Sequence, residues 1–255
     1  MSNRLRSLAV TAAALALPIA STAFAAPISV IAQNSWDGQA SVSVGGVTIS
    51  AFQTNTPMTA GTIGIKQIPG SPGVPGAGVR GQGNNEIDAF GQGSSEVLRF
   101  QFGPSGSVIN DLVIGLLFDG PEYGDWEEVA RFNVTFADDG STSAFTLATN
   151  WLSNSSSSSS WNGTGTWTPD AIVNGGAGRW SNVNPFGGRA VRTLDMLAVQ
   201  STTCWNNRRS SCSDQSDYVF QSLQATSVPE PGTLALLGLG LAGLGVARRR
   251  RVESR

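Results

Sequence analysis

Short runs in which apolar and polar residues alternate make up most of the chain between its two ends. Residues 41–44 and 47–50 are two such runs, and Gly45-Gly46 joins them. Alternation with a period of two places apolar side chains on one face of a strand, and paired glycines accept the positive φ of a tight hairpin turn. Because no comparable stretch has helical periodicity, the sequence predicts an all-β domain between the two ends.

Six further strands are predicted from alternating or apolar runs, at residues 96–102, 108–118, 128–136, 142–149, 192–200 and 218–225. Regularly spaced strands of this kind favour a single antiparallel two-sheet sandwich, jelly-roll-like. Two stretches interrupt the pattern. Residues 61–93 are dense in glycine and proline and are predicted as a long loop, and the serine run at residues 153–160 is predicted as a solvated connection.

The C-terminal end of the chain differs in composition from the rest. An uncharged run of 15 residues, from Thr233 to Ala247, is followed at once by four arginines, Arg248, Arg249, Arg250 and Arg251. As a helix the run would be about 22 Å long, shorter than a hydrocarbon core of about 30 Å. Clustered arginines resist crossing and stay on the cytoplasmic side. We interpret the run as a short transmembrane sorting helix that anchors the protein transiently; a buried core helix would not end in four arginines.

An extended segment precedes this run, with the residues Val228, Pro229, Glu230, Pro231, Gly232 and Thr233. Its two prolines disfavour helix, so the segment is accessible just outside the membrane. The motif, the apolar run and the arginine cluster together resemble the C-terminal sorting signal of PEP-CTERM proteins. The resemblance implies processing during export by exosortase, a membrane-embedded cysteine-protease-like enzyme. A second segment, residues 84–88 with residues 96–100, resembles one that recurs in the sandwich domains of exported PEP-CTERM proteins, and this supports the fold.

The N-terminal end resembles a secretory signal. Arg4 and Arg6 precede an apolar run at residues 8–20, and Ala23-Phe24-Ala25 has the small-x-small pattern of a cleavage site. We expect export through the Sec machinery and cleavage by signal peptidase between Ala25 and Ala26; an uncleaved anchor is the alternative. The predicted organisation is a signal peptide at residues 1–25 that forms an N-terminal signal helix, a β-sandwich domain at 26–226 and a sorting signal at 227–255.

The charge of the mature domain excludes one class of partner. Seven of the 16 basic residues and one of the 18 acidic residues lie outside residues 26–232, so this segment has 9 basic and 17 acidic residues, a net charge of −8. This domain has a single lysine, Lys66. A mildly acidic domain has no basic surface for nucleic acid, so no nucleic-acid partner is expected.

The chain has two cysteines, Cys204 and Cys212, close together in a polar segment. In an exported protein this predicts one disulfide that closes a short loop, a constraint worth about 2.5 kcal/mol. A metal site is the competing interpretation. It is weaker, because two thiolates in a chain without histidine do not complete the usual four-ligand zinc shell.

The absence of histidine also excludes a Ser-His-Asp or Cys-His catalytic centre. A carboxylate pair, as in glycoside hydrolases, is the catalytic chemistry that is left. The candidate acids are Glu86, Asp88 and Glu96, or Asp119, Glu122, Asp125, Glu127 and Glu128. Acidic residues in glycine-rich segments are more often solvated turn residues, so no catalytic residue is assigned.

Two binding sites are also considered. Loop carboxylates supply the hard oxygen ligands of calcium, and Asp119, Glu122 and Asp125 have suitable ligand types without EF-hand spacing. Trp151, Trp161 and Trp167 flank the serine run and would stack on sugar rings if they were exposed, although tryptophan in a sandwich is more often core.

We therefore expect an exported, non-enzymatic protein of the cell envelope or outer surface, sorted by an exosortase-type system and transiently anchored in the inner membrane. Association with extracellular polysaccharide or biofilm matrix is implied by the family resemblance alone. A lectin-like carbohydrate-binding module is the first alternative, and a carboxylate-dependent glycoside hydrolase is the second.

Overall fold

The computed structural model describes residues 25–68, 74–81, 84–90, 94–117, 127–153, 156–173, 176–200 and 216–229, together with residues 238, 240, 242 and 243. Ala25–Pro229 form one compact unit. The domain predicted from the sequence ends at residue 226. The compact unit ends at Pro229 and therefore includes the first three residues of the predicted sorting signal.

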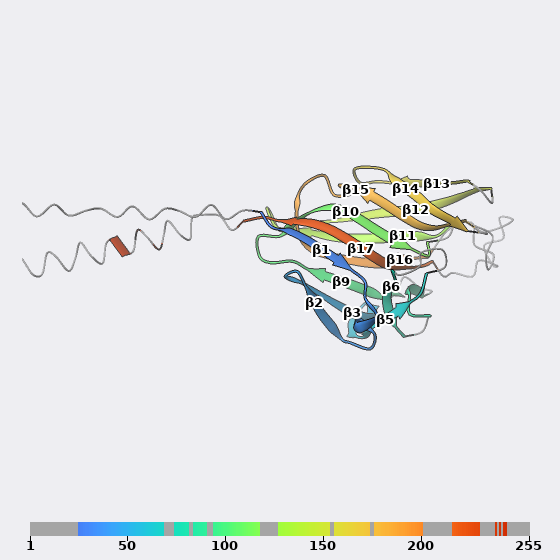
Figure 1. Ribbon diagram of the computed structural model, residues 1–255, viewed down its shortest axis with the longest axis horizontal. Coiled ribbons are helices and arrows are strands. Elements are labelled where there is room, and N and C mark those ends of the chain that lie inside the picture. The colour runs from blue at the N-terminus through green and yellow to red at the C-terminus, as the bar shows by residue number, and fades with distance from the viewer. Residues whose placement is uncertain are drawn as a thin grey trace, which may run out of the picture. The chain divides into compact units, whose positions relative to one another are not determined.

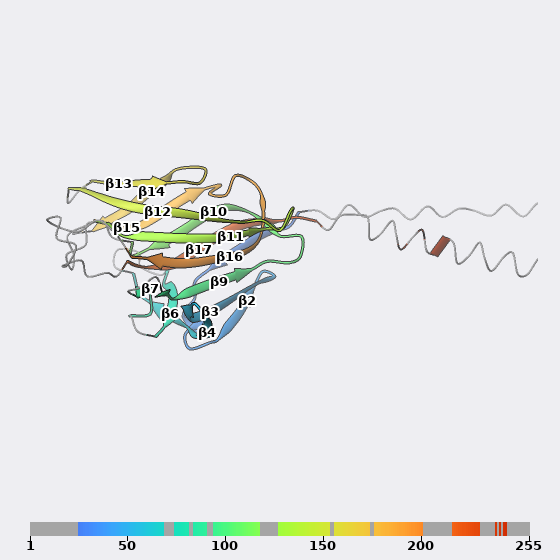
Figure 2. The same cartoon turned by 180° about the vertical axis from the view of Figure 1, so that it is seen from behind.

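The strands of this unit form two rows of antiparallel neighbours. The first row is β1 (Pro27–Ile31), β17 (Asp217–Ser227), β10 (Ser107–Gly115), β15 (Gly176–Val183) and β14 (Trp167–Val173). The second row is β2 (Ser41–Val44), β3 (Val47–Asn55), β9 (Val97–Gln101), β16 (Ala190–Val199), β11 (Val129–Phe136), β12 (Thr142–Ser153) and β13 (Ser156–Trp161). In Figure 1 β1 and β17 of the first row face the viewer, and in Figure 2 β11 and β16 of the second row do.

Shorter strands extend both rows at one side of the unit (Figure 1). They are β4 (Met58–Ala60) beside β3, β5 (Thr62–Lys66) beside β6 (Gly76–Arg80), and β7 (Ile87–Phe90) beside β8 (Ser94–Ser95). β6 and β7 each meet β17, at Phe220↔Ala77 and at Asp217↔Asp88 with Tyr218↔Ile87. A single turn of 3₁₀-helix, η1 (Asn34–Trp36), lies between β1 and β2.

The two rows are parts of one continuous sheet. β16 begins beside β10, where Val191 pairs with Ser107 and Ala190 with Val108, and then continues in the second row. The sheet therefore curls around its core and is nearly barrel-like. The all-β, antiparallel class predicted from the sequence is confirmed, whereas the division into two sheets of a jelly-roll sandwich is not.

Aromatic side chains fill the space between the rows. Phe100 on β9 and Phe220 on β17 are fully buried, with ring centroids 4.6 Å apart. The hydroxyl of Tyr218, on β17, donates to the carbonyl oxygen of Leu197, on β16, at 2.9 Å. Tyr218 is thus buried without loss of its hydrogen bond, and burial raises its pKa well above the ordinary value. These contacts join the two rows through one hydrophobic core.

All the strands predicted from the sequence are present, but two predicted loops are wrong. Residues 61–93 contain β5, β6 and β7, and residues 156–160 of the serine run belong to β13, which ends at Trp161 and pairs with β12. Serine side chains do not prevent a strand when the backbone finds an antiparallel partner, since the ladder bonds satisfy its polar groups. The serine run was predicted as a loop because its side chains bury no apolar surface. Pairing of its backbone with β12 was not considered.

The predicted terminal helices fall mostly outside the described residues. Residues 1–24 are outside them entirely, and of the predicted sorting helix only Gly238, Gly240, Ala242 and Gly243 are described, with helical backbone. Within the described part of the chain, no helix has the length and apolar character needed to cross a bilayer.

Candidate functional site

Three carboxylates from distant parts of the sequence lie together where β7 meets β17. They belong to Glu86, just before β7, to Asp88 on β7 and to Asp217 at the start of β17, and one oxygen of each lies within 4.8 Å of the others. Asp88 and Asp217 are direct partners in the antiparallel register, so their side chains project from the same face of the sheet. We call Glu86, Asp88 and Asp217 the acidic cluster.

Burial makes this arrangement costly. Glu86 is 5% exposed and Asp88 is 6% exposed. Burial raises the pKa of the Asp88 carboxyl above its ordinary value, and a hydrogen bond between the side chains of Asp88 and Glu96 and the charge of the Lys66 ammonium act against this increase. No N–H or hydroxyl group of the described residues donates to the buried Oδ2 atom of Asp88. The cluster therefore concentrates negative charge in a place with little water to solvate it.

Two further side chains border the acidic cluster. Lys66, at the end of β5, forms an ion pair with Glu86 and is about one-third exposed. Glu96 is fully buried, and its Oε2 accepts a hydrogen bond from the backbone N–H of Asp88 at 3.2 Å. The structure thus brings together Glu86, Asp88 and Glu96, the first set of candidate catalytic acids. Lys66 and Asp217 lie beside them.

Two glycines allow Glu86 to reach this position. The N–H of Val79, on β6, donates to the carbonyl oxygen of Glu86 at 2.8 Å, and the amide of Asn85 donates to the carbonyl oxygen of Ile65 at 3.2 Å. A Cβ atom on Gly78 would overlap the backbone of Asn85 and Glu86, and one on Gly64 would overlap the side chain of Asn85. The segment before β7 therefore packs directly on glycine backbone.

Gly78→Ala should destabilise the domain by about 1–3 kcal/mol, because the new methyl group meets backbone that cannot move aside cheaply. Urea unfolding of residues 26–229, followed by tryptophan fluorescence, measures the loss. Gly103→Ala is the matched control, since a Cβ atom there would meet nothing within 4 Å. Equal stabilities of the two variants would contradict the close approach at Gly78.

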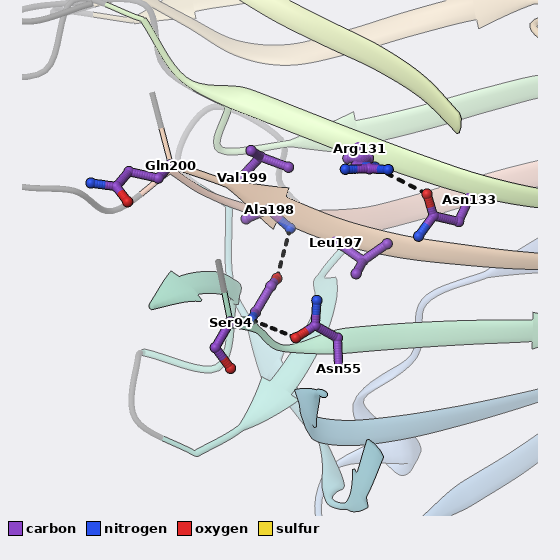
Figure 3. Close-up of a pocket in the computed structure, with 9 residues that line it drawn as sticks. Asn55, Ser94, Arg131, Asn133, Leu197, Ala198, Val199 and Gln200 are labelled. Carbon is purple, nitrogen blue, oxygen red and sulfur yellow. Dashed lines mark hydrogen bonds between the residues drawn. The ribbon is translucent and has the colours of Figure 1, made fainter. Parts of the chain in front are cut away.

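A pocket of about 240 Å³ lies beside this region, between β3, β8, β11 and β16 (Figure 3). Its polar side chains include Asn55, Ser94, Arg131, Asn133 and Gln200. The guanidinium of Arg131 donates to Asn133 Oδ1 at 3.1 Å, and this bond fixes the two side chains relative to each other. The pocket therefore presents amide, hydroxyl and guanidinium groups of the kind that form hydrogen bonds with polar ligands.

Ser95 connects the pocket to the acidic cluster. Its hydroxyl oxygen accepts a hydrogen bond from the N–H of Ala198 at 3.1 Å and lies 3.1 Å from the carbonyl oxygen of Asp88. Its backbone N–H donates to Asn55 Oδ1 at 3.2 Å. One buried serine thus contacts both the backbone of Asp88 and the wall of the pocket.

Trp161 and Trp167 belong to a group of aromatic rings packed around Phe132. Trp167 is 3% exposed and stacks on Phe132, with ring centroids 5.7 Å apart, so the prediction that it stacks on glycans is wrong. Trp161 is half-buried, packs edge-on to Phe132 and Trp167, and donates from Nε1 to the carbonyl oxygen of Thr164 at 2.8 Å. The side chain of Trp151 lies outside the described residues.

Both ends of the domain leave it from the same pair of strands. The predicted cleavage site, Ala25–Ala26, is exposed and directly precedes β1, which pairs with β17 along its whole length. Ala26 N donates to Ser227 Oγ, and Ser227 N donates to Ala26 O, each at 2.9 Å. Val228 and Pro229 follow at once, and Pro229 is exposed. The predicted signal-peptidase site and the first two residues of the sorting motif are therefore neighbours in space.

Several other predicted site residues lie outside the described residues. They are Cys204 and Cys212 of the disulfide, Asp119, Glu122 and Asp125 of the calcium site, Glu230, Pro231, Gly232 and Thr233 of the motif, and the arginines Arg248, Arg249, Arg250 and Arg251. The disulfide and this calcium site stay predictions. Of the remaining candidate acids, Glu128 is buried at the start of β11, where its backbone pairs with Thr149.

Sequence reasoning missed two members of this region, Lys66 and Asp217. Lys66 was visible as the single lysine of the mature domain, in a stretch predicted as a loop. Asp217 directly precedes a predicted strand, but no local pattern indicates that this strand end meets Asp88. Only the pairing of β7 with β17 brings the two carboxylates together.

Comparison with known families identifies the C-terminal segment. Residues 227–251 match the model described as the PEP-CTERM protein-sorting motif. Neither a curated protein sequence nor a solved structure matches the chain. The resemblance inferred from Pro229-Glu230-Pro231, the apolar run and the arginine cluster is thus confirmed for the tail.

Proposed function

Because the chain carries the PEP-CTERM sorting motif of an exported exosortase substrate, we propose that its β-domain is a non-enzymatic structural protein of the cell envelope or extracellular matrix. One observation carries the proposal. A single compact unit lies between the predicted N-terminal signal and the matched sorting motif, and the chain enters and leaves this unit at the β1–β17 pair. The processed product would be this domain alone, with both processed ends at one edge.

The mature domain would associate with extracellular polysaccharide and be anchored in the inner membrane only during export. Its net negative charge disfavours binding to anionic surfaces and suits a solvated protein in a hydrated matrix. The burial of Glu86, Asp88 and Glu96 supports a non-enzymatic role, since a polymer substrate would have to reach both members of a catalytic pair.

Carbohydrate binding is a second candidate function, and the pocket in Figure 3 is the observation that favours it. Arg131, Asn133 and Asn55 offer hydrogen-bond donors and acceptors on an accessible concave surface. Such a site would recognise sugar hydroxyls through hydrogen bonds and not through stacking on tryptophan.

Incubation of residues 26–229 with a panel of polysaccharides separates these functions. We expect no release of shorter glycans, and release would contradict the non-enzymatic proposal. Retention on a glycan that is lost in Arg131→Ala, with Arg192→Ala as the control outside the pocket, would establish the carbohydrate-binding function. Absence of both retention and release supports the structural role.

A further inference from the structure

The acidic cluster brings like charges close together. Asp88 and Asp217 are directly opposed in an antiparallel ladder, where like charges destabilise pairing, and Glu86 adds a third carboxylate within 4.8 Å. Lys66 supplies one positive charge, which pairs with Glu86. A cation between Asp88 and Asp217 would relieve the repulsion across this strand pair.

A second observation points to a ligand at this position. Asp88 is more than nine-tenths buried and lies close to the carboxylates of Glu86 and Asp217, and no N–H or hydroxyl group of the described residues donates to its Oδ2 atom. A buried carboxylate oxygen without a partner is costly, because it has lost its water without a replacement. A cation bound among the three carboxylates would replace that water.

We propose that Glu86, Asp88 and Asp217 form a calcium-binding site that ties β7 to β17. Calcium accepts six to eight oxygen ligands at about 2.3–2.6 Å, so two ligand oxygens on one ion are at most about 4.6–5.2 Å apart. The oxygens of the cluster meet this condition. Hard carboxylate oxygens, with no histidine in the chain, favour calcium over zinc or copper.

Lys66 sets the affinity of this site. Its ammonium pairs with Glu86, so a calcium ion that binds Glu86 must displace it. The Lys66 side chain is about one-third exposed and can swing into solvent when this happens. The competition weakens binding toward the range of about 10⁻⁴–10⁻³ M that is usual for extracellular calcium modules.

The site uses other residues than the predicted loop site at Asp119, Glu122 and Asp125. It is next to the pocket, because Ser95 contacts the backbone of Asp88 on one side and the side chain of Asn55 on the other. Calcium binding would therefore hold β7, β8 and β17 in a fixed relation at the edge of the pocket.

Calorimetric titration of residues 26–229, freed of metal with EDTA, tests the proposal with calcium chloride alone as the probe. This segment contains the whole described hydrophobic core and lies within one compact unit. We expect one bound ion per chain and a rise in Tm of about 3–6 °C at calcium ten times Kd. Magnesium chloride at the same concentration and ionic strength should give a smaller rise, and an equal rise would contradict the assignment to calcium.

Three variants locate the ion. Asp88→Asn and Asp217→Asn should weaken binding by about tenfold or more, the loss that follows when about 1.4 kcal/mol of ligand energy is removed. Lys66→Gln should tighten it, because the competing ammonium is gone. Asp138→Asn, the same change at an ion pair with Arg189 outside the cluster, should bind as the unchanged protein does.

The Tm of each variant in EDTA shows that it is folded, so lost binding is not mistaken for lost structure. If Asp88→Asn fails to fold, Asp217→Asn decides the matter, since Asp217 is less buried. A wild-type protein without a calcium-dependent Tm, an unchanged affinity in both Asp variants, or an unchanged or weaker affinity in Lys66→Gln would overturn the site.

Discussion

Replacing Pro229, Glu230 and Pro231 together with alanine should leave the protein unprocessed in the inner-membrane fraction of its host. The prolines keep the segment extended, and alanine in their place allows the apolar helix to continue toward the domain. Exosortase would then meet neither the extended backbone nor the Glu230 carboxylate. We expect the processed form to fall by about tenfold or more, which corresponds to about 1.4 kcal/mol of lost recognition energy.

Cell fractionation followed by immunoblotting measures this change. The control is a triple alanine substitution of Val252, Glu253 and Ser254, which lie beyond the matched motif and should be processed normally. Normal processing of the Pro229-Glu230-Pro231 variant would contradict the role of this motif. A defect in both variants would show that any change near the C-terminus blocks export.

Phe132→Ala should cause the largest loss of stability in the β-domain, about 3–5 kcal/mol. Phe132 lies on β11, is fully buried, and its ring contacts those of Trp161, Trp167, Phe186 and Tyr218 at centroid distances of 5.7–6.4 Å. Truncation removes the ring that joins the two rows of strands at this position. Urea unfolding of residues 26–229 measures the loss, and thermal unfolding should show a Tm lower by about 10 °C.

Phe145→Ala is the matched control for this prediction. Phe145 lies on β12 in the same aromatic group, with its ring 5.8 Å from that of Trp161 and 5.2 Å from that of Phe186, but it is only half-buried. Its truncation should cost less, because the cavity opens toward solvent. Equal losses in the two variants would show that Phe132 is not central to the core.

The strands that alternate strictly could be predicted from the sequence. Residues 129–136 place Phe132, Val134 and Phe136 in the core and leave Asn133 and Thr135 half-buried, as the period of two requires. Gly45 and Gly46 have φ values of 58° and 82°, so the turn they were expected to form is present. In these elements the hydrophobic pattern and the turn residues are enough to define the structure, so the prediction from sequence succeeds.

The glycine-rich strands could not be predicted in this way. In β5 and β6, Gly64 and Gly78 are paired in register, and their lack of side chains lets the segment before β7 pack on the strand backbone. Residue composition favours a loop there, since glycine is costly in a strand interior. The reason for glycine lies in the neighbouring segment, which a local pattern does not reveal.

The candidate site, too, could be predicted only where its residues are near one another in the sequence. Glu86, Asp88 and Glu96 were recognised as acids near one another in the sequence, and β7, β8 and β9 bring them together locally. Asp217 is far along the chain and joins them only through the pairing of β7 with β17. The tryptophans were assigned to the surface as one hypothesis, but the curl of the sheet places Trp167 in the core.

Mass spectrometry of the protein recovered from its host is the most direct test of its assignment as an exported exosortase substrate. We predict a polypeptide that begins at Ala26 and lacks Arg248–Arg255, found in the envelope or outside the cell. An intact chain from Met1 to Arg255, recovered free in the cytosol, would contradict it.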